Sequence, residues 1–158
     1  MNFIFLTVLL AQSFFGGLPV DGIQCNQNEG SVEHIHSHLQ LLNDGHNVEV
    51  PAGIGISQVS QCLYWLHTHT PDGFIHIESP VSRSFTLGQF FDIWGENLSW
   101  TQAASVKASA GKRLSIWVNG KPWHGADPRS IVLRDMQAIV IQSGPPYAKA
   151  EHVDWSKV

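Results

Sequence analysis

Fixed positive charge is missing from the first half of this 158-residue sequence, in which no lysine or arginine occurs before Arg83. The whole chain has a formal net charge of -4, so it offers no basic footprint for nucleic acid, and we expect no nucleic-acid partner. A region with many neutral histidines, a few carboxylates and no fixed cation tolerates a bound cation better than a bound anion. Cations are therefore the first class of ligand to consider.

Sulfur ligands and familiar catalytic motifs are also scarce. The chain has only two cysteines and two methionines, Met1 and Met136, which argues against a Cu(I) carrier built on thioether or thiolate ligands. It contains no G-x-S-x-G, P-loop, Rossmann fingerprint or H-E-x-x-H motif. Nothing points to a Ser/His/Asp triad, although triads assemble in space and have no fixed spacing in sequence.

An apolar stretch opens the chain. Residues 1–20, MNFIFLTVLLAQSFFGGLPV, include an apolar run long enough for an export signal, followed by small residues, but no positive charge precedes the run. Asn2, Thr7 and Gln12 make a full membrane span marginal. We interpret residues 1–20 as a signal peptide or an N-terminal membrane anchor, with a buried strand as the alternative. The first two interpretations predict an exported protein that is periplasmic, extracellular or anchored on the outer face of a membrane.

The rest of the chain is long enough for one domain with a single core. An apolar content of 43% with six tryptophans is typical of a folded protein and not of a disordered one. We expect a polar linker over residues 21–31 and a single α+β domain over residues 32–144. Residues 145–158 are expected to form a loosely ordered C-terminal tail.

The two cysteines, Cys25 and Cys62, are expected to form a disulfide bond if the protein is exported. Closing that loop would contribute roughly 3–4 kcal/mol by the chain-entropy model. The bond would also hold the linker close to the second histidine-rich stretch. Two thiolate metal ligands are the alternative, and two free buried cysteines are expected only in a cytosolic protein.

Six of the nine histidines lie in two short stretches, and the first of these is VEHIHSHLQLL. His34, His36 and His38 alternate with apolar or small residues, so they share one face of a predicted half-buried strand. The following NDG sequence is typical of a hairpin turn. One face of this strand is therefore expected to present three imidazoles.

The second stretch, LHTHTPDGFIHIES, is a predicted hairpin with a Pro-Asp-Gly turn. His67 and His69 precede the turn, and His76 and Glu78 follow it. The simplest hairpin register would place His69 and His67 across from His76 and Glu78. The two halves would then present three histidines and an acid on one face.

A short helix is predicted after this hairpin, because Thr86 and Gln89 have capping-box spacing and Gly95 suits the C-terminal end. Its apolar stripe consists of Leu87, Phe90, Phe91 and Trp94. The predicted order of hairpins, helix and C-terminal strands is close to ββαββ, and the C-terminal half looks similar to the closing half of β-grasp domains. We therefore predict an α+β fold with a mixed β-sheet, β-grasp-like with an inserted histidine-rich hairpin, packed against one short helix.

Imidazoles on adjacent strands can converge on one ion, because neighbouring strands are about 4.8 Å apart and ring nitrogens bind metals at about 2.1 Å. His34 and Glu78 are either further ligands or groups that orient a ligand by hydrogen bonding. A buried hydrogen-bonded network and a set of solvated surface histidines are the alternatives to a metal site. The expected metal ligands are the histidines His36, His38, His67, His69 and His76.

Imidazole with carboxylate suits Cu(II) or Zn(II), and the sequence does not separate the two metals. The first functional hypothesis is an exported transition-metal-binding protein. The second is a hydrolytic or oxidative metalloenzyme in which Glu78 acts as general base beside a metal-bound water. The third is a non-catalytic interaction module whose histidines form an internal network. The sequence predicts no particular protein partner. Anchoring to a membrane through the N-terminus is the one further interaction that it suggests.

Residues 34–95 also resemble a group of exported bacterial proteins that share four motifs. The motifs are H-x-H-x-H-L, P-A-x-I-G-I, L-H-T-H-x-x-x-G-x-I-H-I-E-S-P and F-T-L-G-Q-F-F-D-x-W, and each is present here. The resemblance implies that this block is one structural unit, but it implies no particular activity. The residue after L-H-T-H is usually an acid in that group, and here it is Thr70.

Overall fold

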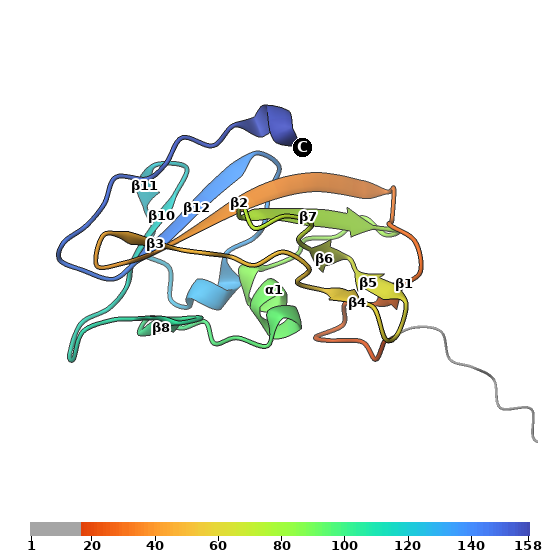
Figure 1. The fold of residues 1–158 in the computed structure, drawn as a ribbon, viewed down its shortest axis with the longest axis horizontal. Coiled ribbons are helices and arrows are strands. Elements are labelled where there is room, and N and C mark those ends of the chain that lie inside the picture. The colour runs from red at the N-terminus through yellow and green to blue at the C-terminus, as the bar shows by residue number, and fades with distance from the viewer. Residues whose placement is uncertain (1–16) are drawn as a thin grey trace, which may run out of the picture.

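The computed structural model describes residues 17–158, so most of the expected signal peptide or anchor over residues 1–20 lies outside the described part. The fold is α+β: most of its elements are strands, and α1 (Leu87–Trp94) is the one α-helix among residues 17–158. Figure 1 shows α1 against one face of the central sheet, while the C-terminal segment crosses the opposite face. No helix within residues 17–158 is long and apolar enough to cross a membrane.

The central sheet has seven strands in the order β11-β10-β12-β2-β7-β6, and β3 pairs with the end of β2. β12 runs parallel to β2, and the other neighbouring strands are antiparallel. This is the mixed sheet that the sequence predicts, while the likeness to β-grasp domains stays a prediction. The strands are β2 (Glu33–Asn43), β3 (His46–Val48), β6 (Leu66–His67), β7 (Phe74–Ser79), β10 (Ser115–Val118), β11 (Lys121–Pro122) and β12 (Gln137–Gln142).

Shorter elements surround the central sheet. A three-stranded sheet has the order β1-β5-β4, and β8 pairs with β9 in a separate ladder. There are also two 3-10 helices: η1 precedes β12, and η2 lies near the C-terminus. The bounds are β1 (Cys25–Asn26), β4 (Ile56–Ser57), β5 (Cys62–Tyr64), β8 (Gln102–Ala103), β9 (Val106–Lys107), η1 (Pro128–Ser130) and η2 (Trp155–Lys157).

The N-terminal and C-terminal flanks pack on the domain. Within residues 21–31, Ile23 is fully buried and the disulfide bond Cys25–Cys62 joins β1 to β5. Within residues 145–158, the Trp155 ring packs edge-on against Phe74 with ring centroids 5.6 Å apart. The N-terminal flank also reaches the central sheet, because the Gly30 N–H donates to the Glu78 carbonyl oxygen of β7, so both flanks contact the sheet that carries the histidines.

Helix α1 begins and ends where the sequence predicts. The Gln89 backbone N–H donates to Thr86 Oγ1, and the Thr86 backbone N–H donates to the Gln89 side chain, which forms a capping box. Gly95 has a φ of 79°, the left-handed conformation that ends many helices and that glycine adopts without strain. These caps fix the two ends of α1.

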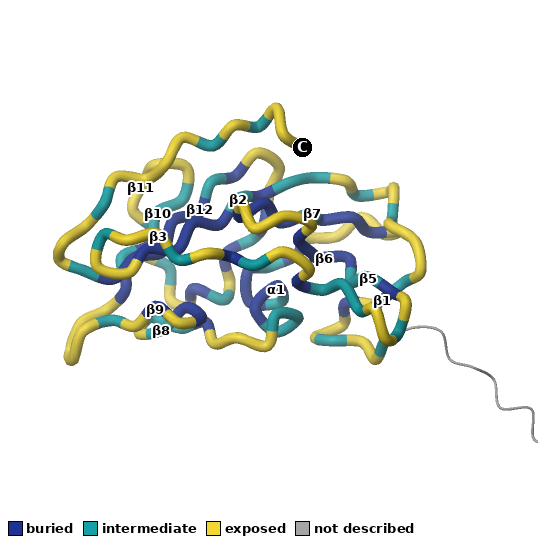
Figure 2. The backbone as a smooth tube through the Cα atoms, in the orientation of Figure 1, coloured by how far each residue is buried: buried dark blue, intermediate teal, exposed yellow. Residues whose placement is uncertain are grey.

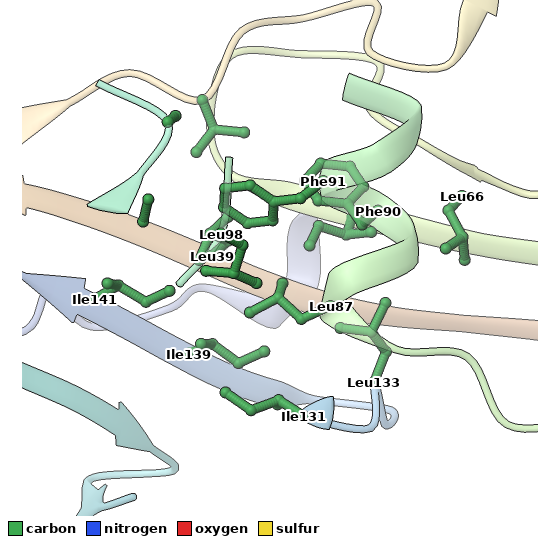
Figure 3. Packing of buried hydrophobic residues seen from close by; sticks show 14 of the residues in the cluster. Leu39, Leu66, Leu87, Phe90, Phe91, Leu98, Ile131, Leu133, Ile139 and Ile141 are labelled. Carbon is green, nitrogen blue, oxygen red and sulfur yellow. The ribbon is translucent and has the colours of Figure 1, made fainter. Parts of the chain in front are cut away.

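One face of the sheet packs against α1 to form the core. Figure 3 shows Leu39, Ile139 and Ile141 projecting from β2 and β12 toward Leu87 and Phe91 of the helix, and all five are at most 1% exposed. The tube in Figure 2 is buried along the centre of the sheet and exposed at the C-terminal segment. Because side chains alternate along a strand, the histidines of β2 and β7 lie on the opposite face.

Candidate metal centre

The predicted histidine strands meet on the face of the central sheet that points away from α1. His36 of β2 lies opposite His76 of β7, and His76 lies opposite His67 of β6. Three neighbouring strands therefore place one imidazole each in a single row across the sheet. The simplest hairpin register is wrong, because His67 pairs with His76 and Glu78 pairs with His34 of β2.

The register differs because β6 ends at His67. The next residue, Thr68, is fully buried and leaves the hairpin: its backbone N–H donates to the Ile54 carbonyl, and its hydroxyl donates to the Pro51 carbonyl at 2.8 Å. His69 consequently lies beyond the end of the strand, where its Nε2 is 3.2 Å from His67 Nε2. The segment before β4 thus determines where His69 sits.

Four side chains form a first set that can hold a metal ion, the inner group: His67, His69, His76 and Glu78. One ligand atom from each lies within 4.8 Å of all the others. The side chains of His67 and Glu78 are 0% and 4% exposed, and His76 Nδ1 is 3.2 Å from Glu78 Oε1. Ligand atoms around a tetrahedral ion with bonds near 2.1 Å are about 3.4 Å apart, so these separations are close to those of a coordination sphere.

Three side chains form a second set, the outer group: His34, His36 and Glu78. Their ligand atoms also lie within 4.8 Å of one another, and His34 Nε2 is 3.6 Å from Glu78 Oε1. His36 Nε2 is 3.1 Å from His76 Nδ1, so the outer group directly adjoins the inner group. Each group has one exposed histidine: the side chain of His34 in the outer group is 57% exposed, and that of His69 in the inner group is 42% exposed.

The ring of His67 presents a defined nitrogen to the inner group. Its Nδ1 is 2.9 Å from the backbone carbonyl oxygen of Tyr64, and because a carbonyl oxygen only accepts, we infer that Nδ1 carries the proton. In the neutral ring Nε2 then has a free lone pair, which faces His69. A hydrogen bond of this kind is the usual way in which a metal-binding imidazole is oriented.

Protons compete weakly for the buried imidazoles. Burial, with neighbouring histidines, lowers the pKa of His76 to about 3, and burial lowers the pKa of His67 to about 4. Burial also lowers the pKa of His36, with His34 adding to the effect. Near pH 7 these rings are neutral, so their lone pairs are available to a metal ion.

Glu78 has an oxygen atom that the protein leaves without a partner. Its Oε2 is buried and has no hydrogen-bond partner among the described residues. Burial, reinforced by the nearby Glu29 carboxylate, raises the pKa of Glu78 to about 7. A buried carboxylate oxygen costs free energy unless a hydrogen bond, a proton or a cation compensates it. A metal ion would supply that compensation, so Glu78 fits a metal site.

Glu29 is a member of the site that sequence reasoning did not identify. Its Oε1 is 3.5 Å from His69 Nε2 and 4.0 Å from His67 Nε2. The segment reaches the site because Cys25 is covalently joined to Cys62 and the Gly30 N–H donates to the Glu78 carbonyl oxygen. The composition of residues 21–31 predicts a linker, and only the disulfide bond could have indicated that its acid lies near the histidines.

His38 lies apart from both groups, although its position in β2 predicts a ligand. Its Nε2 is 2.9 Å from the Asp72 carbonyl oxygen, and its ring packs edge-on against Phe74. Burial lowers the pKa of His38. The side chain lines a polar cleft of about 230 Å³ between the sheet and the C-terminal segment near Glu151. The structure therefore brings together His34, His36, His67, His69, His76 and Glu78, but not His38.

Comparison of the chain with family models, with curated proteins and with solved structures finds no match. The resemblance of residues 34–95 to exported bacterial proteins therefore stays a prediction. The Cys25–Cys62 disulfide bond is typical of proteins in oxidising compartments. The geometry of the two groups is therefore the feature of the molecule that points to a function.

Proposed function

We propose that this protein binds a transition-metal ion, Cu(II) or Zn(II), through the inner group. The observation that carries the proposal is the convergence of three imidazoles and one buried carboxylate from β6, β7 and the segment after β6. His67, His69, His76 and Glu78 supply a complete set of four ligands, which is the number a tetrahedral site requires. His38 has no part in the proposal, because its nitrogen faces a backbone carbonyl.

The donor atoms restrict the metal but do not name it. Imidazole nitrogen is a borderline ligand and carboxylate oxygen is a hard one, and both cysteines are joined in the disulfide bond. We accordingly propose Cu(II) or Zn(II) and not Cu(I). The disulfide bond also supports binding outside the cytoplasm, in a protein exported by residues 1–20 as a signal peptide or an anchor.

Elemental analysis of tag-free protein after loading with Zn(II) or Cu(II) and desalting tests the proposal. We expect bound metal in the wild type and a large loss in His67→Ala/His69→Ala. The matched control is His46→Ala/His124→Ala, which removes two exposed histidines outside both groups and is expected to keep full metal content. Equal metal content in the two double variants would contradict the ligand assignment.

An internal histidine network is the second candidate, and the ring contacts favour it. The His67–His69 and His36–His76 nitrogen separations of 3.2 and 3.1 Å also suit hydrogen bonds between neutral rings. If this candidate is correct, the wild type binds neither metal, and His69→Ala lowers the free energy of unfolding in metal-free buffer. The loading experiment therefore separates the two candidates.

A metalloenzyme in which Glu78 acts as general base is the third candidate function. The raised pKa of Glu78, about 7, and its unpartnered Oε2 favour this role, since a base works best with a pKa near the working pH. In this case a metal-bound water would occupy one ligand position in place of the carboxylate. Hydrolysis of activated esters by the metal-loaded wild type, lost in Glu78→Gln with metal retained, would support it.

A further inference from the structure

The inner and outer groups share a single residue, Glu78, and no other. Together the two groups contain five imidazoles and one carboxylate, which is more than one tetrahedral ion can use. His34 and His36 come from one end of β2, while His67 and His69 approach from β6 and the segment after it. The donors therefore divide into two sets around a common carboxylate.

The position of Glu78 suits a bridge between two ions. Its Oε1 is 3.2 Å from His76 Nδ1 of the inner group and 3.6 Å from His34 Nε2 of the outer group. Its Oε2 is buried without a partner. Both groups therefore face the same oxygen, Oε1, so this carboxylate is placed to be shared by two ions, and a nearby cation would also compensate the buried Oε2.

The surrounding charge matches more than one divalent cation. Besides Glu78, the inner group faces Glu29, whose Oε1 is 3.5 Å from His69 Nε2. The outer group lies beside Asp135, which accepts a hydrogen bond from the His36 backbone N–H at 3.2 Å. Three carboxylates therefore lie beside the two groups, and among residues 17–158 none of the three forms an ion pair with a lysine or arginine.

The two groups also differ in access to solvent. The buried Glu78 belongs to both groups, and the inner group adds the fully buried His67 and the partly exposed His69, with side chains 0% and 42% exposed, so that it offers four ligands. The outer group includes His34, with a side chain 57% exposed, and it offers only three ligands. A site with four protein ligands is closed, whereas a site with three leaves a position for water or an incoming donor.

We propose that the protein holds two metal ions in a dinuclear centre bridged by the carboxylate of Glu78. This rests on the proposed metal-binding function and extends it. The inner ion binds His67, His69 and His76, the outer ion binds His34 and His36, and the two ions share the carboxylate of Glu78, whose Oε1 faces both groups. The inner ion exchanges slowly, while the outer ion exchanges with solvent and is the one that accepts a further ligand.

Titration of the metal-free full chain with Cu(II), followed by calorimetry and electron paramagnetic resonance, tests this proposal. We expect two equivalents per chain in the wild type, with a spectrum at full loading in which the two ions are magnetically coupled. His34→Ala is expected to reduce binding to one equivalent and to restore an uncoupled Cu(II) signal. His46→Ala, which removes an exposed histidine on β3, is expected to behave like the wild type.

Glu78→Gln is the variant that tests the bridge, and His34→Gln keeps the test valid if His34→Ala folds poorly. An amide has no anionic oxygen that two ions could share, so Glu78→Gln should lose the coupled spectrum. Saturation of the wild type at one equivalent would overturn the dinuclear centre and leave the proposed function intact. Two equivalents without magnetic coupling would overturn the bridge, and no binding at all would overturn both proposals.

Discussion

The two faces of β2 are covered in different ways. Leu39 and Leu41 are at most 1% exposed on the face that packs against the hydrophobic core, and burial of these side chains stabilises the fold by itself. On the other face, His36 and His34 contact other polar groups and remain partly exposed. The apolar face needs no ligand to be stable, because its side chains are already buried. The histidine face gathers polar atoms that satisfy one another only in part, so it has the most to gain from a bound cation.

Truncation on the apolar face is expected to give the largest effect on stability. Ile139 is fully buried between β2, β10 and α1, and Ile139→Ala should lower the free energy of unfolding by about 2–5 kcal/mol through lost burial and a cavity. His34→Ala on the histidine face should change it by less than about 1 kcal/mol in metal-free buffer. Urea denaturation of both variants measures the contrast, and equal losses would contradict the division into two faces.

Removal of the disulfide bond should lower both the stability of the fold and the affinity for metal. Cys25→Ser/Cys62→Ser opens a loop with a sequence separation of 37 and should cost about 2–4 kcal/mol of unfolding free energy. It should also weaken metal binding, because Glu29 is held four residues from Cys25. Urea denaturation and metal titration measure the two effects. An unchanged metal affinity would show that the disulfide bond serves the fold alone.

Removal of the Glu29 carboxylate, which lies beside the histidine face, should have a smaller effect that is confined to metal binding. Glu29→Ala should weaken metal affinity by up to about tenfold, or roughly 1.4 kcal/mol, because a carboxylate near the cation is lost. Glu33→Ala is the matched control: it removes a nearby carboxylate whose contact is the Ser82 hydroxyl. Isothermal titration of both variants provides the comparison, and similar affinities would mean that Glu29 takes no part in metal binding.

Gly30→Ala tests whether the position of Glu29 beside the histidines matters, and it leaves the Glu29 carboxylate in the chain. A Cβ atom at Gly30 would lie 2.1 Å from the Ser79 carbonyl carbon, so the segment that carries Glu29 must move away from β7. We expect a loss of metal affinity similar to that of Glu29→Ala, together with a small loss of stability. If Gly30→Ala bound metal as well as the wild type, the close approach of this segment to β7 would not matter for the site.

Local patterns in the sequence predict the helix, the two faces of β2 and the disulfide bond, because each depends on nearby residues or on composition. The capping residues Thr86 and Gln89 are one example. The register of the second hairpin was not predictable, because Thr68 bonds to Pro51 and not to the turn. Long-range contacts also decide where Glu29 and His38 lie: the Gly30 N–H bonds to the Glu78 carbonyl of β7, and the His38 ring bonds to the Asp72 carbonyl, and neither contact has a signal in the local sequence.

The two faces of β2 should finally differ in how the free energy of unfolding depends on pH. Burial raises the pKa of Glu78 from 4.5 to about 7, so in metal-free buffer the folded state binds more protons than the unfolded state between these values. The contribution of Glu78 to stability is therefore present at low pH and is lost as the pH rises toward 7.

His67 and His76 act in the opposite direction. Their pKa values fall from 6.5 to about 4 and about 3, so the unfolded state binds more protons below pH 6.5 and stability is lost as the pH falls. Glu78→Gln isolates the carboxylate: its stability relative to the wild type should rise between pH 5 and 7, and saturating Zn(II) should abolish the trend in favour of the wild type. Urea denaturation across this range measures the difference, and a flat difference in metal-free buffer would mean that Glu78 is already compensated by the neighbouring histidines.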